Sequence, residues 1–276
     1  MAQGGLAPAD LERWSLHVAM SFVLGQGGDL TDFRPALERQ KFLGIEYPDG
    51  KPRTFYPIGT SLLAVPGVVI ASWVKPTLLE QLRRTGDDQL EKVLASVIGA
   101  LAATTFFWLI HGQFRDLWIA GSSTFIFAFC TSMWSTATRA LWQHGPLVLM
   151  LVIAMLLLQR ARHRPALIQF VSLPLAFAFL CRPTAMISIV VISAYMLIYY
   201  RRWFLAYLFW SAFIAVPWLA YNLSIYGTPY PQYYVGSWGH GSLSSMWGGL
   251  LGNLLSPSRG LLIYSPVLIF SISGFL

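Results

Sequence analysis

The sequence has few charged residues. Only 11% of its 276 residues are Asp, Glu, Lys or Arg, whereas an ordinary soluble domain has about 25%. Apolar residues make up 55% of the chain, and 15% of the residues are aromatic. This composition excludes an ordinary soluble enzyme. It indicates an integral membrane protein with many aromatic rings available for the membrane interfaces.

Cysteine is almost absent, with only Cys130 and Cys181 in the chain. Each lies in an apolar stretch, so the pair provides neither a disulfide framework nor the spacing of metal ligands, and both are expected to be small core residues. The chain also lacks a G-x-x-x-x-G-K-[ST] phosphate loop and an H-E-x-x-H motif. No charged residue lies mid-span in the later apolar segments, as an ion pathway would require.

The net charge of +7 comes from 19 Lys and Arg against 12 Asp and Glu, and basic pairs such as Arg201 and Arg202 lie at the ends of apolar runs. This pattern is explained by membrane topology better than by binding of nucleic acid. Residues 1–56 form a polar N-terminal segment without a run long enough to span a bilayer. Apolar segments follow at Pro57 to Val74, Val93 to Ile110, Ile119 to Trp134, Pro146 to Leu158, Ala166 to Cys181, Thr184 to Tyr200, Trp203 to Tyr221 and Leu261 to Leu276.

The sequence therefore predicts an all-α, polytopic transmembrane helical bundle in a single membrane domain. Residues 1–92 are expected to form an extracytoplasmic loop with interfacial helices, and residues 93–221 the transmembrane helices. Residues 222–260 are expected to form a second extracytoplasmic loop, and residues 261–276 the start of a further span. Several of the apolar segments are shorter than the roughly 20 residues that cross a bilayer, so flanking residues must extend them.

Arginines set the predicted orientation. Arg160, Arg162 and Arg164 lie in one short loop, and the pair Arg201 and Arg202 lies in another, two spans later. Cytoplasmic loops collect basic residues, so both loops are assigned to the cytoplasm. Residues 136–145 and 222–260 then lie outside.

The segment Pro57 to Val74 has two possible placements. Pro57, Gly59, Pro66 and Gly67 disfavour a straight spanning helix and favour an interfacial or re-entrant one, which places the polar N-terminal segment outside the cell. A true span would place that segment in the cytoplasm instead. The outside placement requires an upstream span, and the last apolar run ends at the chain terminus, so the sequence is expected to be part of a longer protein.

Asp10 and Arg13 are the first candidates for chemistry. They lie three residues apart at the start of an expected amphipathic helix that ends at Gly25. A helix cap beside a solvated cation explains the pair. A carboxylate that accepts a proton and a cation that binds a phosphate leaving group explain it as well. Asp29 and Asp32 are weaker candidates, because the surrounding glycines indicate a turn.

Further polar residues are expected at the outer ends of the spans. Arg139, Gln143 and His144 follow the third apolar segment, where they either cap a helix or face a cavity. Arg182 lies on the predicted outer side, although basic residues collect on the cytoplasmic side, so it either faces a cavity or extends its charged end to the interface. Arg259 and Tyr264 lie late in the chain, and Tyr56 precedes the Pro/Gly break. Tyr56, Arg259 and Tyr264 belong to segments expected at the membrane interface, where they either anchor the chain or meet an anionic head group.

Several of these motifs resemble the GT-C glycosyltransferases, including the bacterial lipid A aminoarabinose transferases and the protein O-mannosyltransferases. The resemblance rests on Asp-Leu-Glu-Arg at 10–13, Gly-Asp at 28–29, Tyr-Pro-Ile-Gly at 56–59 and the polar end of the third apolar segment. It also covers Arg-Pro at 182–183, Gly-x-Pro at 227–229 and the late Ser-Pro-Ser-Arg-Gly to Tyr-Ser-Pro run at 256–266.

The resemblance implies an inverting glycosyltransferase of the bacterial inner membrane, with its active site on the extracytoplasmic face. The donor would be a polyprenyl-phosphate sugar and the acceptor a lipid, glycan or protein, among membrane lipids and without nucleic acid. Asp10 would be the general base. Arg13, Arg139, Arg182 and Arg259 would bind the donor phosphate, and Gln143, His144, Tyr56 and Tyr264 would line the acceptor site or cavity.

Two questions stay open at the level of sequence. Some members of this superfamily carry a second acidic residue where this chain has Gln143 and His144, so no cofactor is assigned and the requirement for a divalent metal is open. A transporter or lipid flippase without catalytic chemistry is the alternative function. It predicts a polar path near the middle of the membrane, whereas the polar residues here gather toward one face.

Overall fold

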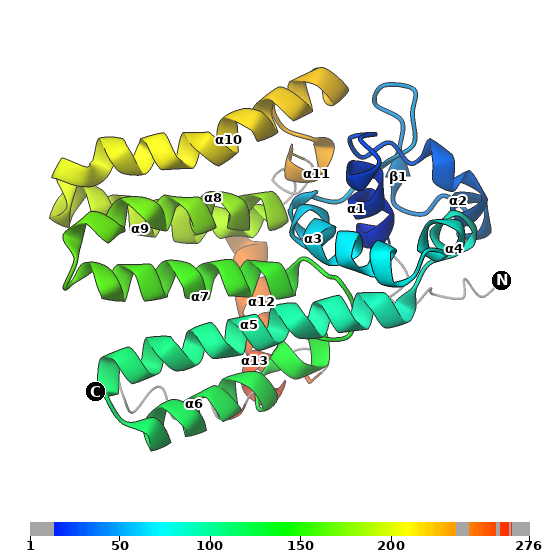
Figure 1. Ribbon diagram of the computed structural model, residues 1–276. Helices are drawn as coiled ribbons and strands as arrows, with labels where there is room; N and C mark the ends of the chain where they lie inside the picture. The colour runs from blue at the N-terminus through cyan, green and yellow to red at the C-terminus, as the bar shows by residue number, and fades with distance from the viewer. Residues whose placement is uncertain (1–13, 236–242, 258–259, 265, 267–276) are drawn as a thin grey trace.

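The structure is a computed structural model that describes residues 14–235, 243–257, 260–264 and 266. The described chain is mostly helical, as the sequence predicts. One small antiparallel sheet pairs β1 (Ile45–Glu46) with β2 (Arg53–Thr54). The chain divides visibly into a compact N-terminal head, residues 14–87, and a layer of long helices beside it (Figure 1).

The head contains four α-helices and a short 3-10 helix, Thr31–Phe33. The α-helices are α1 (Ser15–Val23), α2 (Arg34–Arg39), α3 (Gly59–Val74) and α4 (Leu78–Arg84). Residues 16–21 of α1 are buried, including the polar His17 and Ser21, and the helix packs mainly against α3. The solvated polar face expected of an amphipathic helix is therefore not found over these residues. The N-cap of α1 is Trp14, which also corrects the expected start of this helix at Asp10. Helix α1 ends at Val23, just before Gly25 takes a φ of 74°.

Helices α3 and α4 meet at an angle of 114°. Lys75, Pro76 and Thr77 separate them, and a proline cannot continue the helical hydrogen-bond ladder. The bend excludes one straight helix through this region. It is compatible with a broken span or a re-entrant segment, and the sequence favoured an interfacial or re-entrant one.

Six further helices run back and forth beside the head (Figure 1). They are α5 (Asp88–Phe114), α6 (Leu117–Phe129), α7 (His144–Ala161), α8 (Ser172–Cys181), α9 (Met186–Tyr199) and α10 (Phe204–Tyr226). Within the described chain, the stretches 88–114, 144–161 and 201–226 are each long and apolar enough to cross a membrane. The remaining three bundle helices are shorter apolar helices. A membrane protein with a helical bundle is therefore supported.

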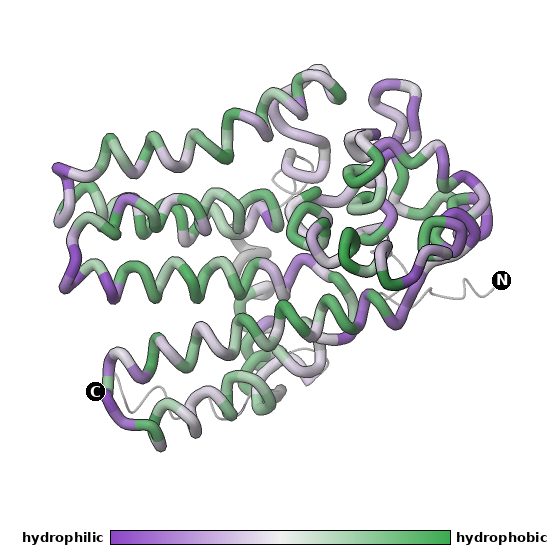
Figure 2. The backbone as a smooth tube through the Cα atoms, viewed as in Figure 1, coloured by the Kyte–Doolittle hydropathy of each residue, from purple (hydrophilic) through white to green (hydrophobic). Residues whose placement is uncertain are grey.

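The bundle has two chemically different ends (Figure 2). At one end lie the turns after α5, after α7 and after α9, which carry the arginines at 115, 160, 162, 164, 201 and 202. We call this the arginine end. The opposite end, where α7 begins and α8 and α10 finish, lies against the head and is called the head end. The two arginine loops, which were predicted to lie on the same side of the membrane, thus lie at the same end of the bundle.

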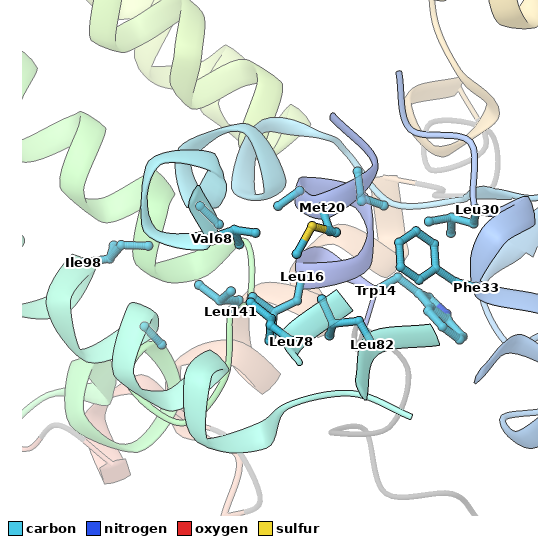
Figure 3. Close-up of a cluster of buried hydrophobic side chains, with 14 of the residues drawn as sticks. Trp14, Leu16, Met20, Leu30, Phe33, Val68, Leu78, Leu82, Ile98 and Leu141 are labelled. Carbon is cyan, nitrogen blue, oxygen red and sulfur yellow. The ribbon is translucent and has the colours of Figure 1, made fainter. Parts of the chain in front are cut away.

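Buried apolar side chains join the head to the bundle. A cluster that includes Trp14, Leu16 and Phe33 in the head continues to Ile98 of α5 and to Leu141 before α7 (Figure 3). A second cluster packs Ile58 of the head against α8 and α10. Burial of large apolar side chains is the main favourable term in such packing, and it fixes the head at this end of the bundle.

Two expectations are corrected in the later chain. Residues 222–260, expected to be a loop, contain the end of α10 and the helices α11 (Gln232–Val235) and α12 (Leu243–Leu255). Most of the expected span 261–276 lies outside the described residues, which cover only the short helix α13 (Leu261–Tyr264) and residue 266, so this expectation stays a prediction. Among the two cysteines, Cys181 is buried as expected, but Cys130 is exposed after α6, so its expected core position is wrong.

Candidate functional site

The predicted site residues divide into two groups. Asp10, Arg13 and Arg259 lie outside the described residues, as does the side chain of Tyr264, which ends α13. The described ones are Tyr56, Arg139, Gln143, His144 and Arg182. Four of these five meet at the head end.

The meeting point is a cluster that we call the Arg182 cluster. Its members are Tyr56, Gln143, His144, Arg182 and Tyr233. Nη1 of Arg182 lies 2.7 Å from Nδ1 of His144. The hydroxyl of Tyr233 donates to Oε1 of Gln143 over 3.2 Å, and the rings of Tyr233 and Tyr56 lie 5.9 Å apart between centroids. Segments from the head, from two bundle helix ends and from α11 therefore contribute to one polar cluster.

Local backbone structure explains how Gln143 and His144 reach this position. A five-residue π-helical turn, Met133–Ala137, follows α6 and ends the third apolar segment. Such turns are frequent at functional sites. A tight turn follows, in which the N–H of Trp142 donates to the carbonyl of Ala140 over 2.8 Å. Gln143 then serves as the N-cap of α7, and His144 is its first helical residue.

Arg182 is positioned by the proline after it. It follows α8 with extended backbone angles, φ −158° and ψ 130°, which the residue before a proline favours. The guanidinium is thereby turned toward the start of α7. Nη1 of Arg182 also lies 2.9 Å from Nε2 of His144. Because guanidinium groups only donate hydrogen bonds, the accepting nitrogen of His144 must be the one that carries no proton. Arg182 is half-buried, so its remaining N–H groups are available to an anion.

Arg139 does not join this cluster. It is exposed, and it forms no side-chain hydrogen bond or ion pair with any residue that the structure describes. No hydrogen bond or ion pair in the described part of the chain links Arg139 to Gln143 or His144. The role of Arg139 in phosphate binding stays a prediction.

Sequence reasoning missed Tyr233 and Tyr234. Tyr234 is buried, and its hydroxyl donates to the carbonyl of Phe179 over 3.0 Å, which ties α11 to the end of α8. Its ring also contacts Trp218 of α10 at 5.3 Å between centroids. The signal in the sequence was the Pro-x-Tyr-Tyr run after a glycine that ends a helix, in which aromatic hydroxyls are placed to find buried partners.

A small polar cavity adjoins the cluster. Thr60 and Gln143 line it together with Ser61 and Tyr56, and its volume is about 10 Å³, which is close to the volume needed by one water. Thr60 and Gln143 are 2% and 4% exposed. Thr60 Oγ1 and Gln143 Nε2 have no hydrogen-bond partner among the described residues. Binding a sugar here requires the head and the bundle to separate locally.

A second polar network lies in the head and fixes its loops. Arg53 binds Asp49 through two nitrogens, at 3.0 Å and 2.6 Å from Oδ2, and donates to the carbonyl of Gly27 over 2.8 Å. The Tyr221 hydroxyl of α10 donates to the same carbonyl over 3.1 Å. The hydrogen bonds from Arg53 hold the pKa of Asp49 below its usual value, against the opposing effect of burial.

Asp29, a weaker candidate for the base or for a metal, has a structural role here. Its Oδ1 accepts from the backbone and the hydroxyl of Thr31, at 2.9 Å and 2.6 Å, and its Oδ2 lies 2.9 Å from Nζ of Lys51. Burial alone raises the pKa of Asp29, but the hydrogen bonds from Thr31 and Lys51 outweigh it and lower the pKa. The turn predicted around Asp29 is confirmed, with Gly27 and Gly28 both at positive φ.

A larger cavity of about 780 Å³ is lined by residues of α1, α2, α4 and the start of α5. Its lining mixes the basic residues Arg39, Lys41 and Lys75 with acidic residues such as Asp87, and Lys75 is paired with Asp87 at 2.7 Å. A mixed lining does not select a charged ligand of either sign. In the described part of the chain, no three His, Cys, Asp or Glu residues gather in a way that suits a metal ion.

Comparisons with known proteins add no assignment. No protein-family model matches the chain, and no match was found among curated proteins or among solved structures.

Proposed function

We propose that the protein is an inverting membrane glycosyltransferase that uses a polyprenyl-phosphate sugar and works at the head end of the bundle. The observation that carries the proposal is the contact between Arg182 and His144 beside Gln143 and Tyr56. A cation and hydrogen-bonding groups thus gather at one end of apolar helices. This is the arrangement that a lipid with a charged phosphate requires, since its tail stays in the membrane and its head group lies at the edge.

Each group has a role in the proposed reaction. The acceptor hydroxyl attacks the anomeric carbon, and the bond from that carbon to the lipid phosphate breaks. Asp10 takes the proton from the hydroxyl as general base. Arg182, with Arg13, Arg139 and Arg259, neutralises the negative charge that develops on the departing phosphate. Gln143, His144, Tyr56 and Tyr264 contact the acceptor or line the cavity.

The distribution of charge supports the proposed orientation. The arginines at 160, 162, 164, 201 and 202 gather at the opposite end of the bundle from the cluster. The positive-inside rule places that end in the cytoplasm. The head end then faces outward from a bacterial inner membrane, and lipid, glycan or protein acceptors reach it there.

Transfer of labelled sugar tests the proposal. Membranes that contain the full chain are incubated with a panel of radiolabelled undecaprenyl-phosphate hexoses and pentoses, and label is followed into the lipid, glycan and protein fractions. Wild-type membranes are expected to transfer one of these sugars, and Asp10→Asn membranes to lose turnover while still binding the donor. Near wild-type transfer by Asp10→Asn contradicts the base assignment. Absence of transfer from the whole panel contradicts the proposed class.

A further inference from the structure

A basic hollow lies at the arginine end, far from the proposed active site. It has a volume of about 430 Å³ and lies between the ends of α5 and α7 and the segment that follows α7. The lining includes the following residues that bear on its chemistry: Trp108, His111, Arg115, Arg160, His163 and Arg164.

The charge of this hollow is of one sign. None of its lining residues is acidic, so the lining differs from the mixed one in the head. Arg115, Arg160 and Arg164 are exposed, and among the described residues none of their side chains forms a hydrogen bond or an ion pair. The C-termini of α5 and α7 each carry only about half a negative charge. Three guanidinium groups therefore exceed what the helix ends neutralise.

The backbone at Arg115 gives an independent indication. Arg115 is the C-cap of α5 and takes a left-handed conformation, with φ 57° and ψ 22°. Glycine adopts this conformation without steric cost and is the usual residue at such an end. An arginine there holds its guanidinium at the edge of the hollow at some conformational cost, which indicates a use for the side chain.

The walls of the hollow are held together and reach the membrane region. Nε2 of Gln159 in α7 donates to the carbonyl of Leu109 in α5 over 2.8 Å, which fixes the two helix ends side by side. Trp108 of α5 lines the hollow and is 49% exposed. Tryptophan is enriched at the level of lipid head groups. The hollow thus combines guanidinium groups with an exposed aromatic side chain.

From this geometry we infer that the hollow binds the phosphodiester head group of an anionic phospholipid, such as phosphatidylglycerol. The arginines donate to the phosphate oxygens, often as bidentate pairs, and the acyl chains pack along α5 beside Trp108. Basic pockets between membrane helices are typical binding sites for such lipids. This site neither shares residues with the Arg182 cluster nor depends on the proposed reaction.

Native mass spectrometry of the full chain, purified in detergent, tests the assignment. Bound adducts are counted while phosphatidylglycerol, phosphatidylcholine or inorganic phosphate is added. The variant R115Q/R160Q/R164Q removes the three lining arginines. The variant R162Q/R201Q/R202Q is the matched control, since it removes the same charge at the same end without touching the lining. Circular dichroism confirms that both variants keep the helical content of the wild type.

The assignment predicts that the lining variant binds phosphatidylglycerol at least about tenfold more weakly than the wild type, since it loses the direct hydrogen bonds from the guanidinium groups to the phosphate, which the control variant keeps. The control variant is expected to change by less than about twofold. If both variants lose the same affinity for phosphatidylglycerol, the basic residues attract the lipid without a defined site, and the proposed site is overturned. Equal binding of phosphatidylcholine, or saturation by inorganic phosphate alone, overturns the lipid assignment. If either triple variant loses helical content, the three single substitutions in each set replace it.

Discussion

Arg182 and His144 are 38 residues apart in the sequence, yet Nη1 of the arginine lies 2.7 Å from Nδ1 of the histidine. The contact joins the end of α8 to the start of α7, in a bundle whose neighbouring helices run in opposite directions. It places a cation beside the turn that carries Gln143. In the proposed reaction this cation receives the phosphate that departs with the lipid.

Replacement of Arg182 by alanine is therefore expected to lower sugar transfer by about 100-fold or more, which is the usual effect of removing one charge-stabilising donor. Arg34→Ala is the matched control, because Arg34 is an exposed cation of the head that pairs only with Glu38 among the described residues. Turnover at saturating donor is the measurement. Equal activity of the two variants contradicts a role for Arg182 in the reaction.

Gly59 is expected to tolerate no side chain. It begins α3 where the helix meets the end of α8, and an added Cβ would lie 2.5 Å from the backbone nitrogen of Cys181. Backbone cannot move aside as a side chain can, so Gly59→Ala is predicted to lower the free energy of unfolding by about 1–3 kcal/mol or more. Thermal unfolding in detergent measures this loss.

Gly121 provides the control for that substitution. It lies within α6, and no atom is found within 4 Å of a Cβ built there. Gly121→Ala is therefore expected to leave stability unchanged or to raise it by up to about 1 kcal/mol, because alanine favours helix. A loss at Gly121 as large as that at Gly59 contradicts the close approach of the head to α8.

The head is expected to lose stability in acid because of Asp49. Arg53 lowers the pKa of Asp49 from its usual 3.8 in the folded chain. A carboxylate with a lowered pKa contributes stability that is fully present above the unfolded value and is lost as the pH falls through the folded value. The Asp29 carboxylate, also lowered, acts in the same direction. Resistance of the head to an acid-active protease is predicted to be constant at neutral pH and to fall below about pH 4.

The variant Asp49→Asn separates this pair from other acidic groups. It leaves Arg53, whose side chain is only 8% exposed, without its carboxylate, and is expected to cost about 1–3 kcal/mol at neutral pH. Its stability is also expected to depend less on pH than that of the wild type. Identical pH profiles for the two proteins contradict the assigned pairing.

The sequence predicted the bundle because long apolar runs and arginine clusters determine spans and their order. It predicted less of the site. Gln143, His144 and Arg182 were found because polar groups at the end of an apolar helix are costly and therefore conspicuous. Tyr233 was missed because its partner is 90 residues away, and no local pattern encodes such a contact. The burial of residues 16–21 of α1 was missed because local periodicity shows one apolar face, whereas tertiary packing also covers the polar His17 and Ser21.

The account depends most on which residues share a side of the membrane. Single cysteines are introduced into a Cys130→Ser, Cys181→Ala background at Lys51 and Tyr230, exposed at the head end, and at Arg162 and Arg201, exposed at the arginine end. Intact cells are then treated with a membrane-impermeant maleimide. Labelling of Lys51→Cys and Tyr230→Cys in intact cells, with Arg162→Cys and Arg201→Cys labelled only after lysis, is the predicted result. The reverse pattern, or a different result for Lys51→Cys and Tyr230→Cys, would contradict it.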